Sequence, residues 1–275
     1  MRMQFNEWRN RKDFSTLIMG ILNVTPDSFS DGGEFNSVPL AVAHALQMEK
    51  DGADIIDIGG ESTRPGAVSV SLQEELDRVI SVITDIRTLS DVMISVDTTK
   101  ADVAREAIVA GASLVNDISG MTADTTMASV VKDFDVPVVI MHIKGTPKDM
   151  QDNPHYHNLM MEINAYFLER ISFAKRSGIN DNQIILDPGI GFGKTVEDNF
   201  TIIKELNTIT GLGHPVLVGP SRKSFIGQTL NLPENERVEG TAAAVVASVI
   251  NGARIVRVHD VKEMWRVVKI ADKLR

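Results

Sequence analysis

The chain has 275 residues, of which 43% are hydrophobic and 24% are charged, and its formal net charge is −9. This acidic balance argues against a general nucleic-acid binder, which would carry a basic face. The lack of any cysteine excludes disulfides, thiolate catalysis and thiolate-held metal clusters. Residues 1–14 lack the apolar core of a signal peptide, and no apolar run reaches the roughly 18 residues of a membrane span. We therefore expect a cytoplasmic protein that does not act on membranes.

Short apolar runs rich in Val and Ile alternate along the chain with longer amphipathic stretches, such as 72–89, 100–110 and 241–251. This alternation predicts parallel strands joined by helices. The predicted strands, in chain order, are 17–23, 54–58, 93–97, 114–117, 137–142, 183–187, 215–219 and 254–258. Their number is the one that closes a (β/α)8 TIM barrel, and an open doubly wound sheet is the structural alternative. Such a barrel needs about 250 residues, so we expect one domain over 1–275, with 1–15 as an N-terminal extension.

A short phrase recurs just before three of these strands. Gly52, Gly111 and Gly252 are each followed by alanine and then by a Val/Ile run. A glycine in this place is typical of a left-handed helix C-cap that leads directly into the next strand. These phrases predict short links at the amino ends of the strands.

The links at the carboxyl ends of the strands are longer and more polar. They cover 24–36, 59–71 and 143–155. Long loops in a compact domain are usually functional, and TIM-barrel enzymes keep their active sites at this end. The sequence therefore places the site at the carboxyl ends of the strands, where residues 27–33 have the glycine pair and small side chains of a mobile lid.

Polar residues stand at or just after the ends of the predicted strands, where apolar residues would be more stable. They are Asn23, Asp97, Asn116, Asp187, Lys223 and Arg257. Polar side chains are poor strand formers, and burying them costs stability unless they meet one another or a ligand. Any single one of them has a second interpretation, as a helix N-cap or a rim ion pair. As a set, they predict a ligand site.

The segment 187–195 follows a strand and ends in Gly-Lys-Thr, as a phosphate-binding P-loop does. That motif requires a glycine five residues before Gly193, and this position is Pro188. The spacing excludes a P-loop nucleotide hydrolase. We expect the glycines instead to turn the backbone close to a ligand held by Asp187.

Histidine and arginine residues in the predicted loops give candidate anion and metal sites. His155 and His157 lie beyond the fifth strand, where a surface pair is favoured over a metal pair. Arg257 and His259 are two residues apart, so they project to the same side and suit an anion, although a rim histidine explains His259 equally well. Arg64 suits a phosphate or carboxylate clamp, with a surface turn as the alternative. Carboxylates and amides at the centre with cations at the edge predict a heterocyclic substrate that carries an anionic leaving group.

Two long motifs make the chain resemble the dihydropteroate synthases. They are Met19-Gly-Ile-Leu-Asn-Val-Thr-Pro-Asp-Ser-Phe-Ser-Asp-Gly-Gly33 and Asp57-Ile-Gly-Gly-Glu-Ser-Thr-Arg-Pro-Gly66. The resemblance continues in order from about Thr16 to the end, and no functional position departs from it. The motifs that continue it are Ser95-Val-Asp-Thr98, Asn116-Asp-Ile118, Met141-His142, Asp187-Pro-Gly-Ile-Gly-Phe192, Ser221-Arg-Lys-Ser224 and Arg257-Val-His259.

The resemblance implies a transferase of folate synthesis and a target of sulfonamides. It would join p-aminobenzoate to 6-hydroxymethyl-7,8-dihydropterin pyrophosphate, giving dihydropteroate and pyrophosphate, with Mg²⁺ as cofactor and a homodimer as the assembly. Family members bind the pterin at positions that match Asp97, Asn116, Met141, Asp187, Gly191 and Lys223. The pyrophosphate positions are Asn23, which also holds the metal, and Thr63, Arg64, Arg257 and His259. The p-aminobenzoate pocket would be bordered by Phe29, Pro65, Phe192, Lys223 and Ser224, and the catalytic roles fall to Asp97, Lys223, Asp31 and Arg64.

The family mechanism breaks the C–O bond to pyrophosphate first, and carboxylates such as Asp97 stabilise the developing cation. The neutral arylamine then attacks, while closed loops exclude water.

Three alternatives to this function remain. A pterin-dependent methyltransferase needs no pyrophosphate clamp such as Arg257 with His259, and an inert pterin-binding paralogue is expected to have lost Asn23, a loop residue or Lys223. A Schiff-base aldolase needs its lysine on a strand that faces the barrel interior.

Overall fold

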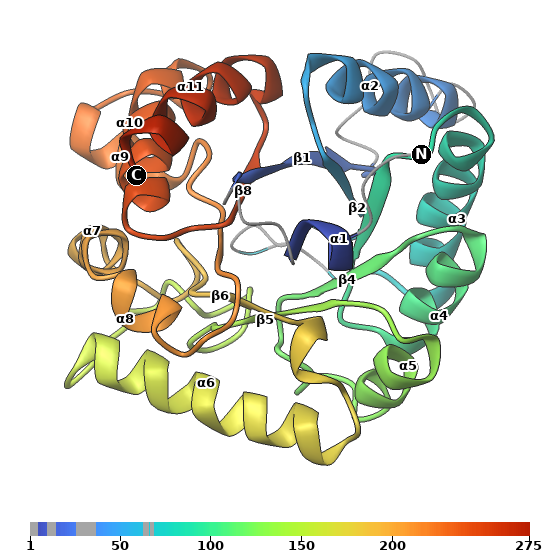
Figure 1. Cartoon of the computed structure of the whole chain (residues 1–275), viewed down its shortest axis with the longest axis horizontal. Helices are drawn as coiled ribbons and strands as arrows, with labels where there is room; N and C mark the ends of the chain where they lie inside the picture. The colour runs from blue at the N-terminus through green and yellow to red at the C-terminus, as the bar shows by residue number, and fades with distance from the viewer. Residues whose placement is uncertain (1–4, 10–14, 26–36, 63–65, 67–68) are drawn as a thin grey trace.

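The computed structural model describes residues 5–9, 15–25, 37–62, 66 and 69–275, which form a ring of parallel strands surrounded by helices (Figure 1). The strands are β1 (Leu17–Asn23), β2 (Ile55–Gly59), β3 (Met93–Asp97), β4 (Leu114–Asp117), β5 (Val138–Met141), β6 (Ile184–Asp187), β7 (Leu217–Val218) and β8 (Ile255–Val258). The α-helices are α1 (Phe5–Arg9), α2 (Ser37–Asp51), α3 (Leu72–Leu89), α4 (Ala101–Ala110), α5 (Met127–Phe134), α6 (Leu159–Arg176), α7 (Val196–Lys204), α8 (Asn207–Thr210), α9 (Ser224–Leu230), α10 (Val238–Ile250) and α11 (Val261–Leu274). Short 3₁₀ helices span Asp181–Gln183 and Glu234–Glu236.

The eight strands pair in the order β6-β5-β4-β3-β2-β1-β8-β7, and all of the pairs are parallel. A parallel bridge between Leu186 and Val216 joins the two ends of this order, and the Leu186 N–H donates to the Pro215 carbonyl at 2.9 Å. The sheet therefore closes nearly completely, which confirms the (β/α)8 barrel and excludes the open sheet. β7 is shorter than predicted because Pro215 and Pro220 flank it and lack the N–H that a ladder needs.

Side chains alternate along each strand between the barrel interior and the surrounding helices, as a strand period of two requires. Inward-facing Leu17, Met19, Ile55, Leu114, Val139, Ile185, Leu217 and Ile255 form one buried cluster. Two residues further along three of these strands stand Asn116, Met141 and Asp187. The period that fills the barrel floor with apolar side chains thus also directs these site residues inward, one layer above.

The predicted glycine caps are confirmed where α2, α4 and α10 give way to the following strand. Gly52, Gly111 and Gly252 have φ of 109°, 121° and 105°. A Cβ on Gly52 would lie 2.2 Å from Cδ1 of Trp265, so this glycine is required by packing as well as by its backbone conformation.

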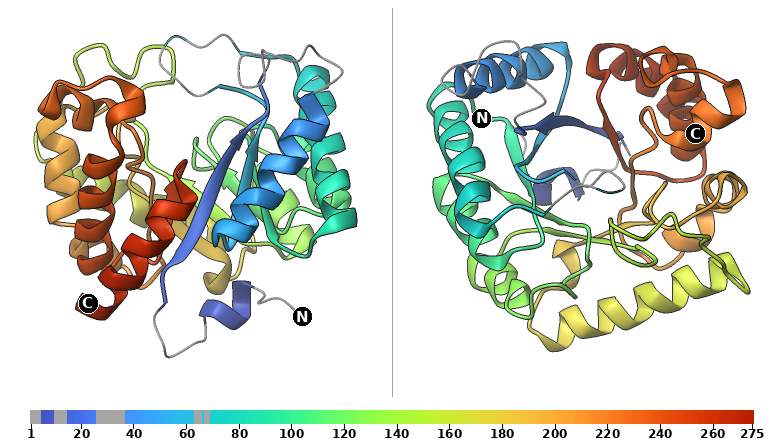
Figure 2. Two further views of the ribbon diagram at one scale, coloured as in Figure 1. Left: turned by 90° about the horizontal axis from the view of Figure 1, so that it is seen from above. Right: turned by 180° about the vertical axis from the view of Figure 1, so that it is seen from behind.

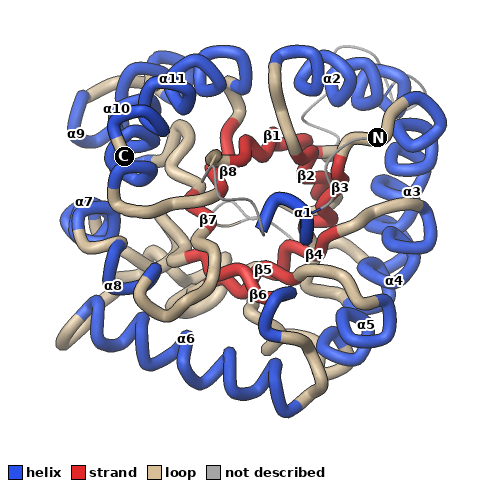
Figure 3. The backbone as a smooth tube through the Cα atoms, in the orientation of Figure 1, coloured by secondary structure: helices blue, strands red, loops and turns tan. Residues whose placement is uncertain are grey.

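Helix α1, within the predicted N-terminal extension, covers the end of the barrel where β1 begins (Figures 2 and 3). Trp8 is fully buried against the inward-facing cluster, and its Nε1 donates to the Ser15 carbonyl at 2.8 Å. The Arg254 guanidinium lies 4.7 Å from the Trp8 ring centroid, and Arg9 Nη1 donates to the Asn182 carbonyl at 2.7 Å. This end of the barrel is therefore plugged, and a ligand has to enter at the opposite end. Among the described helices, none has the length and apolarity to cross a membrane.

Candidate active site

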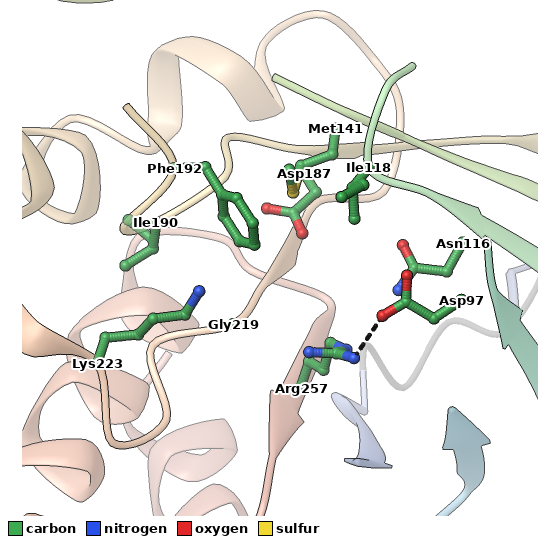
Figure 4. Close-up of a pocket in the computed structure, with 10 residues that line it drawn as sticks. All are labelled: Asp97, Asn116, Ile118, Met141, Asp187, Ile190, Phe192, Gly219, Lys223 and Arg257. Carbon is green, nitrogen blue, oxygen red and sulfur yellow. Dashed lines mark hydrogen bonds and ion pairs between the residues drawn. The ribbon is translucent and has the colours of Figure 1, made fainter. Parts of the chain in front are cut away.

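A pocket lies at the carboxyl ends of the strands and brings together residues from β3, β4, β5, β6 and β8 and from the loops that follow them (Figure 4). Its lining residues are Asp97, Asn116, Ile118, Met141, Asp187, Ile190, Phe192, Gly219, Lys223 and Arg257. Most of the polar residues predicted from the strand ends therefore meet in one place. We call this pocket the barrel mouth.

One arginine connects the carboxylates at the floor of the barrel mouth. Arg257 Nε donates to Asp57 Oδ2 at 2.6 Å, and its Nη2 donates to Asp97 Oδ2 at 2.8 Å. Asp57 Oδ2 also accepts from Asn116 Nδ2 at 3.1 Å. The Arg257 Nη1 group has no hydrogen-bond partner among the residues that the structure describes, so it remains available to a ligand.

Burial makes the two acidic residues of the mouth weaker acids than usual. The pKa of Asp97 is raised to about 7 by desolvation, with Arg257 opposing the rise and the nearby Asp57 carboxylate adding to it. The pKa of Asp187 is raised to about 6 by desolvation, against the Gly189 N–H that donates to its Oδ1 at 2.7 Å and the charge of Lys223. Both carboxyls are therefore poised to respond to a charged or hydrogen-bonding ligand near neutral pH.

Lys223 lies at the side of the mouth, just before α9. Its Nζ stands 4.0 Å from the centroid of the Phe192 ring, a cation–π contact that fixes both side chains. Desolvation and the charge of Arg257 lower the pKa of Lys223 to about 8. Because Lys223 is the N-cap of α9, it is not a strand lysine of the kind an aldolase needs.

The glycine loop after β6 is shaped mainly by its own protein neighbours. Gly189, Gly191 and Gly193 have φ of 67°, 80° and 66°, and a Cβ on Gly189 would lie 2.0 Å from the His142 carbonyl oxygen. Lys194 is 3% exposed, and its Nζ donates to the Phe192 carbonyl at 2.8 Å. This lysine is thus held inside the protein, in agreement with the exclusion of a P-loop.

A wider cleft of about 820 Å³ opens from the mouth toward α9. Three of the predicted pyrophosphate residues, Asn23, Arg257 and His259, line it together with Ser224. The backbone N–H of His259 donates to Ser221 Oγ at 3.1 Å, and that hydroxyl lies 3.0 Å from His259 Nδ1. Desolvation and Arg257 lower the pKa of His259 to about 3, so it offers an N–H donor rather than a charge.

Several predicted site residues lie outside the described residues, namely Phe29, Asp31, Thr63, Arg64 and Pro65. The same holds for the predicted lid at 27–33. His155 and His157 are exposed, with ring centroids 5.3 Å apart. Across the described ranges no group of three or more His, Asp or Glu residues is arranged to hold a metal ion.

Asp57 was not predicted as a site residue, although it begins the second motif, and the structure places it between Asn116 and Arg257. Asp57 is fully buried on β2, within the run Ile55-Ile-Asp-Ile-Gly59. A charged residue inside such an apolar strand was the available signal, because buried charges need partners. Gly219 was missed as a lining residue, and it carried no comparable signal.

Comparisons with known proteins agree with this geometry. The sequence profile of the family described as "Pterin binding enzyme" matches residues 19–259. The dihydropteroate synthase of a Synechocystis strain is 51% identical over 98% of this chain and 92% of its own length. That of Escherichia coli K12 is 46% identical over 93% of this chain and 90% of its own length.

Solved structures of dihydropteroate synthases share the fold at similar identities. The Yersinia pestis enzyme in a sulfonamide complex has a TM-score of 0.91 and 46% identity, covering 96% of both chains. The Xanthomonas albilineans enzyme with 7,8-dihydropteroate has a TM-score of 0.86 and 37% identity, covering 96% of this chain and 95% of its own. The same enzyme with 4-aminobenzoic acid has a TM-score of 0.89 and 42% identity, covering 94% and 93%.

Proposed function

Because this chain belongs to the dihydropteroate synthases, a family of pterin-binding transferases, we propose that its barrel mouth holds the pterin and its wider cleft holds the pyrophosphate and p-aminobenzoate. The observation that carries this proposal is the meeting of Asp97, Asn116 and Asp187 in one pocket that continues into a cationic cleft. We assign the heterocycle to the first space, for its convergent polar groups, and the anionic leaving group to the second, for its cations.

The pterin ring offers adjacent N–H donors, which match the acceptors of the mouth. Asp187 accepts two parallel N–H bonds from the amidine-like edge of the ring, as carboxylates do with planar donors. Asn116 adds an amide with both donor and acceptor character. Met141, which is 2% exposed, packs against the ring, while Lys223 borders it and Gly191, which lines the wider cleft, lies at its edge.

The pyrophosphate lies over Arg257 and His259 in this proposal. Arg257 Nη1, which has no hydrogen-bond partner within the described part of the chain, supplies a charged donor, and neutral His259 supplies an N–H. Thr63 and Arg64, from the second loop, are the other residues that we assign to the pyrophosphate. Mg²⁺ fits here because it binds phosphates with few protein ligands, and the hard amide oxygen of Asn23 lines the cleft. When bound, the metal ion would neutralise the leaving group.

p-Aminobenzoate lies between the pterin and the outer cleft. Phe192 and Lys223 form one wall, and Ser224 stands at the entrance. Phe29 and Pro65, which lie outside the described residues, are assigned to the same pocket by the family resemblance. This arrangement places the amine toward the barrel mouth and the carboxylate toward the α9 side.

The reaction begins when the C–O bond to pyrophosphate breaks, leaving a cation conjugated with the pterin ring. Ionised Asp97 stabilises that positive charge in the desolvated mouth, while Arg257 binds the departing anion. The arylamine then attacks through its neutral nitrogen and loses a proton, so no strong base is needed. Asp31 and Arg64 act from the first two loops, which exclude water when they close.

Release of pyrophosphate tests this function directly. Purified protein given the pterin pyrophosphate, p-aminobenzoate and Mg²⁺ should release one pyrophosphate for each dihydropteroate formed. Tight pterin binding without release would identify an inert paralogue. Methyl transfer from methyltetrahydrofolate, again without pyrophosphate release, would identify the methyltransferase.

We also propose a homodimer and a cytoplasmic location, as the family resemblance implies. Phe200, Leu230 and Ile250 are between 45% and 47% exposed on α7, α9 and α10, helices that contact one another. Such a set of apolar side chains suits a subunit interface. Light scattering on the purified chain should give twice its 30.1 kDa mass, and a monomer would contradict the proposal.

A further inference from the structure

Asp57 is a fully buried carboxylate to which the reaction described above assigns no role. It stands on β2, two residues after Ile55 of the inward-facing cluster, and its side chain meets that of Asn116 inside the barrel. An ionised carboxylate in such a place is costly unless several donors compensate it. The residues that Asp57 binds therefore indicate its role.

A single oxygen of Asp57 connects the two halves of the site. Oδ2 accepts from Asn116 Nδ2 at 3.1 Å on one side and from Arg257 Nε at 2.6 Å on the other. Asn116 is assigned to the pterin and Arg257 to the pyrophosphate. The position of one group relative to the other thus depends on one carboxylate.

The same contact determines which face Asn116 presents. If the amide were turned over, its oxygen would face Asp57 Oδ2, and two acceptors would meet about 3 Å apart. The observed orientation leaves Asn116 Oδ1 buried and without a hydrogen-bond partner among the described residues. A buried acceptor in this condition is satisfied only by a donor from a ligand or a water.

Asp57 also acts on Asp97 through Arg257. The two carboxylates share this guanidinium, and the negative charge of Asp57 raises the pKa of Asp97. The other charged groups that bear on Asp97 are Glu75 and Asp117, which raise its pKa, and Arg257, which lowers it. Removing the charge of Asp57 should therefore make Asp97 a stronger acid.

We propose that Asp57 is a positioning residue that orients Asn116 as an acceptor for a pterin N–H and holds Arg257 at a fixed distance from it. The inference rests on the proposed function, because both partners are assigned through that function. Asp57 itself does not contact the substrates.

The test compares Asp57→Asn with Asp117→Asn, a matched control. Asp117 is also fully buried, on β4. Its carboxylate accepts hydrogen bonds from the Ser119 and Met121 N–H groups and not from residues of the barrel mouth. The measurements are thermal unfolding, affinity for the pterin pyrophosphate, and kcat/KM from pH 5 to pH 9. Asp57→Asn should lower kcat/KM by about 10- to 100-fold, the loss expected for a charge-assisted hydrogen bond.

The pH profile distinguishes positioning from a merely structural role. Asp57→Asn should move the acid limb of kcat/KM to lower pH, whereas Asp117→Asn should move it less. A lower melting temperature with an unmoved acid limb, or unchanged kcat/KM, would overturn the proposal. If Asp57→Asn does not fold, Asp57→Ser keeps one acceptor oxygen and serves in its place. Failure of the wild-type protein to release pyrophosphate would instead refute the proposed function.

Discussion

Arg257 has a structural role in addition to its predicted contact with pyrophosphate. Two carboxylates, Asp57 and Asp97, depend on its guanidinium for compensation. Lysine could not replace it, because only a planar fork reaches two acceptors and a ligand at the same time. At this position, binding of the leaving group and stability of the barrel floor are linked.

Arg257→Ala should therefore weaken pyrophosphate binding far more than binding of a bare pterin. It should also lower the free energy of unfolding by about 3–5 kcal/mol, because it leaves buried carboxylates unpaired. Titration with each ligand and urea unfolding measure the two effects. Arg87→Ala is the control. Among the described residues, Arg87 donates to backbone carbonyls alone, such as that of Gly111, so the variant should leave ligand binding intact. Equal losses for pyrophosphate and bare pterin would contradict the assignment.

The titratable side chains of the barrel mouth determine the pH dependence that we expect for the reaction. The pKa values of Asp97, about 7, and Asp187, about 6, are raised, so both carboxyls become neutral as the pH falls through that range. Lys223, with a pKa of about 8, loses its charge as the pH rises. We expect kcat/KM for the pterin substrate to fall below pH 7 and again above pH 8. A profile that stays flat from pH 5 to pH 7 would show that neither carboxyl must be ionised.

At the scale of elements, the loop after β6 is held by the end of its own strand and by the loop that follows β5. The Gly189 N–H binds Asp187, and the Tyr156 hydroxyl donates to the Gly193 carbonyl at 2.8 Å. Gln151 Nε2 donates to the Gly191 carbonyl at 2.7 Å. The wall of the pterin site is thus rigid before any ligand arrives, which lowers the entropic cost of binding.

Gly189→Ala should disturb this wall, and Gly213→Ala provides a matched control. Both glycines have positive φ, 67° and 86°, so alanine is strained at each. A Cβ at Gly189 would meet the His142 carbonyl oxygen, whereas nothing lies within 4 Å of one at Gly213. Gly189→Ala should cost about 1–3 kcal/mol more than the control and weaken pterin binding. Equal unfolding free energies for the two variants would contradict this account.

Helix α1 contributes stability rather than chemistry. Trp8→Ala should lower the unfolding free energy by about 3–5 kcal/mol, as truncation of a buried aromatic side chain does. Trp265→Ala is the control of equal size, because Trp265 is 41% exposed and should cost less. The folded Trp8 variant should keep its kcat/KM, since α1 closes the opposite end of the barrel. A kcat/KM loss without a stability loss would refute the role as a plug.

Over the whole molecule, one end of the barrel holds the candidate site and the other is closed by α1. The first could be predicted from the sequence better than the second. The strand period and the glycine caps located the barrel and its catalytic end, because both depend on local geometry. Asp97, Asn116 and Asp187 were predictable because polar residues end apolar strands. The burial of Lys194 and the packing of Trp8 were not, since each depends on contacts between segments distant in the chain. Asp57 was visible as a charge inside a strand, but its partner Arg257 lies 200 positions away.

The arrangement of both substrates in one continuous space is the central claim, and a crystal structure of this chain with 7,8-dihydropteroate tests it most directly. The pterin ring should lie in the barrel mouth, with its N–H groups within hydrogen-bond distance of Asp187 and Asn116 Oδ1. The benzoate end should lie beside Phe192 and point toward Ser224. A pterin ring bound outside the ring of strands, or reversed so that the benzoate end contacts Asp187, would contradict the account.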